Sequence, residues 1–168
     1  IPRRTLLGGA AVVAGAALVP ARRAVAAPHP TAAPPALGPL ELYLLATPVR
    51  VLDTRQAGGA LARGDVRDVD VTLTLQGFES GVPASTSGVL LNLTLVDTVS
   101  WGYVTVWAAG SPMPGTSSAN FDHSGQTLAN SVISLHTAGS VKVAVDGLVG
   151  CGSHLILDAI GFYDDTGA

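Results

Sequence analysis

Nucleophile and base residue types lie close together at two places, but neither spacing forms a catalytic site. Asp122, His123 and Ser124 are adjacent, whereas the triad of a serine hydrolase needs three side chains that converge from separate elements. Cys151 precedes His154 by three residues in a turn-rich segment, and a small buried thiol is a simpler interpretation than a nucleophile with its base. The histidines also lack the close spacing of a zinc site. We therefore expect a protein that is not an enzyme and that uses no metal or cofactor.

Four charged residues lie in or beside apolar stretches, and we expect them to stabilise the fold. Arg50, Asp53 and Arg55 lie within or just after a short apolar strand, and Asp158 lies inside the last one. Because a buried charge is costly unless it is paired, Asp53 or Asp158 is predicted to form a bidentate pair with Arg50 or Arg55. Ligand recognition by the same residues is the alternative.

Three asparagines fit positions where strands bend or end, since a side-chain amide can satisfy backbone groups there. They are Asn92, Asn120 and Asn130. We assign Asn92 and Asn130 to the structural polar network. Asn92-Leu93-Thr94 also fits the N-glycosylation pattern, but its place inside an apolar run argues against a surface acceptor.

Carbohydrate binding is the ligand chemistry that the sequence supports best. It needs an exposed aromatic platform flanked by amide, carboxylate or hydroxyl groups. Tyr103 and Trp107 share a face of a strand through their even spacing, and Trp101 lies at the entrance of a turn. The candidate polar partners are Asn120, Asp122 and Gln126. The alternative is that the rings cover the core or a contact between subunits.

Strands must position these residues, because alternation with a period of two dominates the chain after residue 40. It is clearest from Val69 to Leu75 and from Val141 to Val145, whereas residues 88–96 are apolar at nearly every position, as in a strand that is central in a sandwich. Shorter strands are predicted at 103–107 and 132–135, and a last strand at 155–163 closes the domain. Turn-forming residues separate the strands at 81–83, 110–115, 123–125 and 147–152. The pattern predicts one all-β domain over residues 41–165, an antiparallel β-sandwich of jelly-roll type with almost no helix.

The first 40 residues predict an export signal and a linker. Arg3 and Arg4 precede an apolar run from Leu6 to Val19, and Ala24-Val25-Ala26 has the small-x-small pattern of a cleavage site. Residues 1–26 are therefore interpreted as a signal peptide similar to the twin-arginine class, and 27–40 as a Pro/Ala-rich linker. Because the run has about 14 residues where a membrane span needs roughly 20, we expect no stable span after cleavage. The expected location is secreted or attached to the cell wall.

The charge of the chain argues against nucleic acid as a partner. The formal net charge is −3, and all twelve acidic residues follow residue 40. Cleavage after residue 26 would remove four of the nine basic residues. The remaining acidic surface repels phosphate backbones, and we expect no nucleic-acid binding.

Six short motifs occur in an order similar to that of a known domain family. They are Pro-Val-Arg-Val-Leu-Asp-Thr-Arg at 48–55, Leu-Asn-Leu-Thr at 91–94, Gly-Tyr-Val-Thr-Val at 102–106, Ser-Ala-Asn-Phe at 118–121, Gln-Thr-Leu-Ala-Asn at 126–130 and Ile-Leu-Asp-Ala-Ile-Gly-Phe-Tyr at 156–163. In these motifs the chain resembles the β-rich domain found, singly or in tandem, in secreted and cell-wall-associated actinobacterial proteins and in tail proteins of their phages. The resemblance covers about residues 46–163.

The resemblance implies a non-catalytic module that accompanies peptidoglycan-active or other extracellular enzymes. Many members of that family have paired cysteines in their later strands, whereas Cys151 is the only cysteine here. Our leading hypothesis is an exported module that binds cell-surface or cell-wall carbohydrate. The alternative is a structural protein that assembles with copies of itself into a homo-oligomer, coat or fibre, including use in a phage tail.

Overall fold

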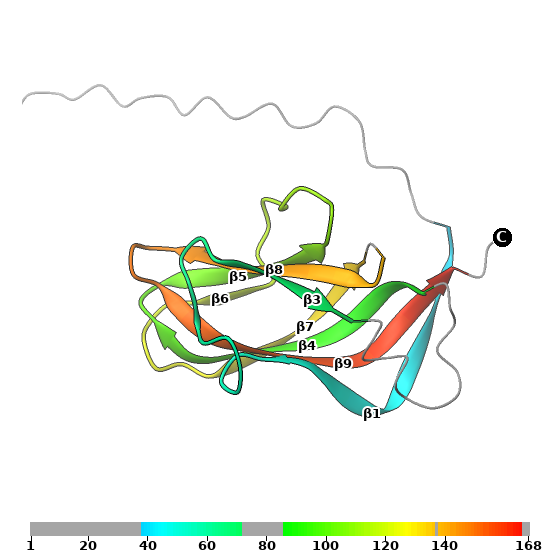
Figure 1. Ribbon diagram of the computed structural model, residues 1–168, viewed down its shortest axis with the longest axis horizontal. Helices are drawn as coiled ribbons and strands as arrows, with labels where there is room; N and C mark the ends of the chain where they lie inside the picture. Colours follow the sequence, from blue (N-terminus) through cyan, green and yellow to red (C-terminus); the bar gives the residue numbers. More distant parts are fainter. Residues whose placement is uncertain (1–37, 72–85, 137, 166–168) are drawn as a thin grey trace, which may run out of the picture. The chain divides into compact units, whose positions relative to one another are not determined.

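The computed structural model describes residues 38–71, 86–136 and 138–165, which form nine strands in two antiparallel sheets (Figure 1). The first sheet has the order β1 (Leu40–Asp53), β9 (Gly152–Asp165), β4 (Thr86–Val99) and β7 (Leu128–Leu135), with the short β2 (Leu61–Ala62) also paired to β9. The second sheet has the order β3 (Val66–Asp70), β8 (Ser140–Gly147), β5 (Gly102–Ala108) and β6 (Ala119–Phe121).

The strand pairs are nested, as in a long hairpin that is wrapped into two sheets. β1 pairs with β9, β3 with β8, β4 with β7 and β5 with β6, and every pair is antiparallel. The additional pairs β4 with β9 and β5 with β8 complete each sheet. This is the jelly-roll arrangement of two packed sheets, so the predicted all-β sandwich is confirmed. Within the described ranges there is no helix, and therefore none that could cross a membrane.

Alternation places the aliphatic core between the two sheets. Four residues of β4 point inward and are fully buried, as are three valines of β8; they are Val89, Leu91, Leu93, Leu95, Val141, Val143 and Val145. Each such side chain contributes roughly 1.5–3 kcal/mol when it leaves water. β4 lies in the interior of its sheet, as residues 88–96 predict, and its outward residues are only partly buried.

Most strands lie where the alternation predicts them. β5, β7, β8 and β9 include the expected stretches, although β1 is much longer than the short strand expected near residue 50, and the short β2 and β6 were not anticipated. β3 begins before Val69 and ends at Asp70, with Val71 just after it, and the rest of the expected strand, residues 72–75, lies beyond the described residues. The export signal 1–26, most of the linker and the turn at 81–83 also lie outside them.

Candidate functional site

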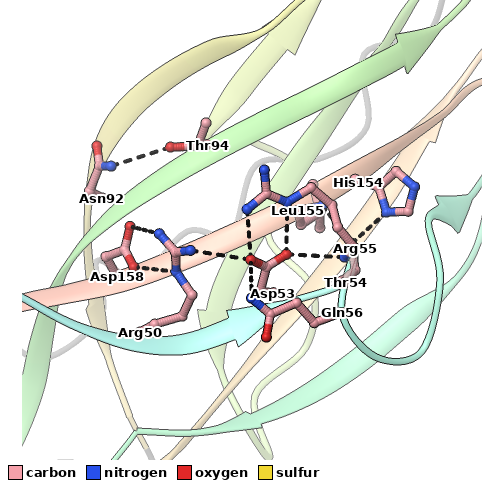
Figure 2. A network of polar contacts seen from close by, with 10 residues as sticks. All are labelled: Arg50, Asp53, Thr54, Arg55, Gln56, Asn92, Thr94, His154, Leu155 and Asp158. Carbon is pink, nitrogen blue, oxygen red and sulfur yellow. Dashed lines mark hydrogen bonds and ion pairs between the residues drawn. The ribbon is translucent and has the colours of Figure 1, made fainter.

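A charged network joins β1 to β9 on the outer face of the first sheet (Figure 2). Arg50 donates from Nε to Asp158 Oδ1 over 2.8 Å and from Nη2 to Oδ2 over 3.2 Å, a bidentate pair. Its Nη1 also donates to Asp53 Oδ2 over 3.2 Å. Arg55 donates from Nε and Nη2 to the two oxygens of Asp53 over 2.9 and 2.8 Å. The structure therefore brings together all four charged residues that the sequence singles out.

The Asp53 carboxylate has little capacity left for a ligand. Its side chain is 5% exposed, and it also accepts hydrogen bonds from the backbone N–H of Arg55 and from Gln56 Nε2. The hydrogen bonds from Arg55 hold the pKa of Asp53 well below its usual range, and pairing with Asp158 raises the pKa of Arg50. Asp53 thus remains ionised at neutral pH and cannot serve as a general acid. The network instead links β1 to β9 through the pair of Arg50 with Asp158.

Thr54 lies within the same motif and has a role that the sequence pattern did not reveal. Its hydroxyl accepts the backbone N–H of Leu155 over 2.8 Å, and its own backbone N–H donates to Leu155 O over 3.0 Å. The hydroxyl proton can then be donated to His154 Nδ1, 3.1 Å away. The sequence signal was its position between Asp53 and Arg55 at the end of a strand, because alternation turns the side chain of Thr54 to the opposite face of the sheet.

The two asparagines assigned to the polar network lie at separate places. Asn92 is in register between Asp158 and Ser131, and its Nδ2 contacts Thr94 Oγ1 over 3.3 Å (Figure 2). Asn130 donates from Nδ2 to Ser118 O over 2.7 Å, which ties β7 to the loop between β5 and β6. Asn130 thus satisfies a backbone carbonyl, while Asn92 lies beside the charged network.

The outer face of the second sheet holds an aromatic cluster with polar neighbours. Tyr103 lies in register between Asn120 on β6 and Asp146 on β8. Trp101 is 46% exposed, and its ring meets that of Tyr103 edge-on with centroids 6.4 Å apart. Asp146 Oδ1 accepts a hydrogen bond from Arg63 Nε over 3.1 Å. The hydrogen bond from the backbone N–H of Gly147 lowers the pKa of Asp146 most, and the hydrogen bond from Arg63 lowers it further. This carboxylate is therefore ionised at neutral pH.

A hollow of about 310 Å³ adjoins this cluster. Its walls are Tyr103, Asn120 and the loop residues Met113, Pro114, Gly115, Thr116 and Ser117. The volume is at the lower end of the range of small-molecule pockets, about 300–1,000 Å³. The aromatic and polar groups therefore lie next to a space that fits a small ligand group.

Gly102 allows the strands to converge beside Tyr103. A Cβ atom on Gly102 would lie 2.5 Å from the ring of Phe121 and 2.8 Å from the backbone oxygen of Asp146. Only glycine permits this approach of β5 to β6 and β8, because larger residues would collide with a buried ring and with backbone.

Three further residues proposed from the sequence for a sugar site have other contacts. Trp107 shares the outer face with Tyr103 but is 7% exposed, and its Nε1–H donates to Ser111 O in the loop between β5 and β6. Gln126 Oε1 accepts the backbone N–H groups of Asp122 and His123, which stabilises the turn after β6. Asp122 remains exposed, and a hydrogen bond with His123 lowers its pKa.

Cys151 and His154 do not form a nucleophile and base. The Cys151 thiol is buried, and this burial raises its pKa. The imidazole of His154 instead contacts Thr54. In the part of the chain that the structure describes, no three His, Cys, Asp or Glu side chains gather in a way that could hold a metal ion.

Comparison with known proteins assigns neither a family nor a function to the chain. The chain matches no protein-family model, no curated protein and no solved structure. Its function is therefore inferred from the geometry of the described residues.

Proposed function

We propose that the chain is an exported, non-catalytic module that binds cell-surface or cell-wall carbohydrate through the outer face of its second sheet. One observation carries this proposal: the half-exposed ring of Trp101 packs against Tyr103, which is flanked by Asn120 and Asp146 beside an open hollow.

The chemistry of this group of residues fits a sugar. The apolar C–H face of a pyranose packs against an aromatic ring, while its hydroxyls need several hydrogen-bonding partners at once. Asn120 offers both an amide donor and an acceptor, ionised Asp146 accepts from hydroxyls, and Arg63 supplies further donors. The ligand would lie over Tyr103 and reach into the hollow.

The N-terminal sequence and the family resemblance support an extracellular location. A cleaved signal at 1–26 would export the domain. The linker at 27–40, with five prolines, would extend ahead of the folded domain by up to roughly 40 Å at about 3.1 Å per residue. The resemblance to wall-associated modules suggests peptidoglycan or another wall polysaccharide as the ligand.

Binding without catalysis is favoured by the state of the carboxylates. Glycoside hydrolysis needs a protonated carboxyl group and a second carboxylate on either side of the scissile bond. Asp146 is ionised and paired with Arg63, and Asp53 is saturated by arginine donors. Neither of these two groups is set up to donate a proton.

Retention on insoluble polysaccharide tests the proposal. The purified chain is incubated with peptidoglycan and with unrelated polysaccharides, and it is also applied to a glycan array. We expect retention on at least one wall glycan, and Trp101→Ala should weaken it about tenfold, since stacking on an exposed ring is worth on the order of 1 kcal/mol or more. Val66→Ala, at an apolar residue of β3 that is 53% exposed, is the matched control.

Retention on no polysaccharide would contradict the proposal. Unchanged binding by Trp101→Ala and by Asn120→Ala would instead place any glycan site elsewhere on the molecule. Circular dichroism of each variant ensures that lost binding does not reflect lost folding.

A further inference from the structure

Exposed apolar residues gather at one end of the outer face of the first sheet. The register places them in two rows that cross β1, β9, β4 and β7 in that order. The first row is Leu42, Tyr163, Gly88 and Leu135, and the second is Leu44, Gly161, Leu90 and Ile133. Leu44 is 69% exposed and Ile133 65%. We call these two rows the apolar face; an exposed apolar surface of this kind indicates an interaction site.

The apolar face is continuous across all four strands. The side chains of Leu42 and Leu44 both lean over Gly161, each within 3.3 Å of the place where its Cβ would be. Leu135 approaches Gly88 in the same way, at 3.5 Å. Because Gly88 and Gly161 have no side chains, the surface is lower along the two central strands than at the edges. The ends of the leucine side chains lie over these glycines.

Two rows that contain charged residues follow along the same strands. The next row is Arg50, Asp158, Asn92 and Ser131, and the one after it is Asp53, Ile156, Thr94 and Ala129. The outer face thus changes from apolar to polar along the strand direction, and any partner must match this change.

We propose that a second copy of the chain covers this face, in a two-fold dimer whose axis runs parallel to the strands and between β9 and β4. This rotation turns each row over onto the same row of the other copy. Leu44 then faces Ile133 of the second copy, and Leu42 faces Leu135. The bulky Tyr163 and Leu90 face Gly88 and Gly161, so that the larger side chains meet the lower parts of the opposite face.

The same rotation matches the polar rows. Asp158 faces the Asn92 amide of the second copy, which can donate a hydrogen bond to a carboxylate, and Arg50 faces Ser131. No like charges of these rows meet. A two-fold axis across the strands would instead set the apolar rows against the charged ones or would use only half of the face, which disfavours that alternative.

The size of the face also fits a dimer. Four strands at about 4.8 Å spacing and four rows at about 6.8 Å give a footprint of roughly 19 by 27 Å, or on the order of 500 Å² on each copy. Two copies bury on the order of 1,000 Å², the lower bound for a specific interface. Two sheets that pack face to face with nearly aligned strands are also a common arrangement.

Light scattering and sedimentation of the purified chain test the dimer. The wild type is expected to be a dimer, and Leu44→Lys and Ile133→Lys should each weaken association about tenfold or more, because each sets a charge against an apolar partner. Val149→Lys, at an 84% exposed residue of the turn between β8 and β9, should leave the dimer intact. Combining Leu44→Lys with Ile133→Glu in one chain should restore it, since opposite charges then meet twice across the interface.

A cross-linking test fixes the geometry. Facing positions of two packed sheets lie about 10 Å apart, which is beyond the Cα separation of about 7 Å that a disulfide can bridge. A chain with both Leu44→Cys and Ile133→Cys is therefore treated with a short bifunctional thiol reagent that spans about 10 Å. We expect a covalent dimer, and much less of it for either single substitution, because two copies of the same position lie farther apart and the native Cys151 is buried.

Three results would overturn the proposal: a monomer at concentrations of hundreds of micromolar, a dimer insensitive to Leu44→Lys, or a doubly substituted chain that forms no intermolecular cross-link. A monomer in which the introduced cysteines resist an aqueous alkylating reagent, and lose this protection when residues 1–37 are removed, would assign the face to the chain's own N-terminal segment instead. Retention on glycan is measured separately, because the proposed sugar site lies on the other sheet.

Discussion

Replacing Thr54 with valine removes one hydroxyl from the junction of β1 and β9 while keeping the shape of the side chain. Thr54 is buried, and its hydroxyl is the acceptor for the backbone N–H of Leu155 over 2.8 Å. Leu155 is itself fully buried. In Thr54→Val this N–H group is left without its acceptor in a place that water does not reach.

The expected loss of stability follows from that single unpaired group. A buried donor without a partner costs about 1–3 kcal/mol. His154 also loses a hydrogen bond, but its half-buried ring can bond to water instead and adds little. A loss of about 2 kcal/mol lowers the ratio of folded to unfolded protein roughly 30-fold and, for a domain of this size, lowers Tm by about 8 °C.

Urea denaturation of matched variants measures the effect. Thr54→Ser keeps the hydroxyl and should lose only about 1 kcal/mol, for one buried methyl group. The free energy of unfolding should therefore decrease in the order wild type, Thr54→Ser, Thr54→Val. The loss caused by Thr54→Val should persist in a His154→Ala background, because the orphaned group belongs to Leu155. A valine variant as stable as the serine variant, or an effect that disappears in the His154→Ala background, would refute this reasoning.

Three further predictions test other parts of the structure. Gly102→Ala should destabilise the domain by about 1–3 kcal/mol in urea, because the new methyl group collides with Phe121, whereas Gly115→Ala, which has open space around it, should change stability little. Burial lowers the pKa of His136, whose Nδ1 accepts a backbone N–H. The contribution of neutral His136 to stability is therefore full above about pH 6.5 and is lost as the pH falls toward the lower pKa of the folded state. His136→Gln should make the urea midpoint depend less on pH between about pH 7.5 and 5. The buried Cys151 should react with a thiol reagent at pH 7 at least about tenfold more slowly in the folded protein than in urea, and equal rates would contradict its burial.

The sandwich could be predicted from the sequence because apolar core residues alternate with outward-facing residues along its strands. The inward residues of β4 and β8 are aliphatic at every second position, which a period of two requires. The full length of β1 could not be predicted in this way, because register shifts between Leu44 and Val49 and between Arg50 and Leu52 interrupt its period, and because it presents leucines to the outside. β6 has three residues, too few for a pattern. The nested order of the strands depends on long-range pairing that alternation does not encode.

The candidate sites were predictable only where a local physical cost demanded a partner. The cost of burying Asp53 predicts an arginine nearby, and two arginines provide it. Arg63 and Asp146 are 83 residues apart in the chain, and only the pairing of β5 with β8 brings Asp146 beside Tyr103. The burial of Trp107 likewise depends on the path of the loop that contains Ser111. Such contacts come from the register between strands, which the spacing of residues along one strand does not reveal.

The two outer faces use their charged groups differently, and this difference connects the two proposals. On the first sheet the carboxylates of Asp53 and Asp158 are bound by arginine donors, so that this part of the face carries paired charges and suits a second copy of the same surface. On the second sheet, exposed Asn120 lines a hollow and retains capacity for hydroxyl groups, and ionised Asp146 lies on the other side of Tyr103. A dimer through the first sheet would turn both second sheets outward. The two proposed sugar sites would then face away from each other, so that one particle would bridge two separate glycan strands and would not gain from a second contact on one flat surface.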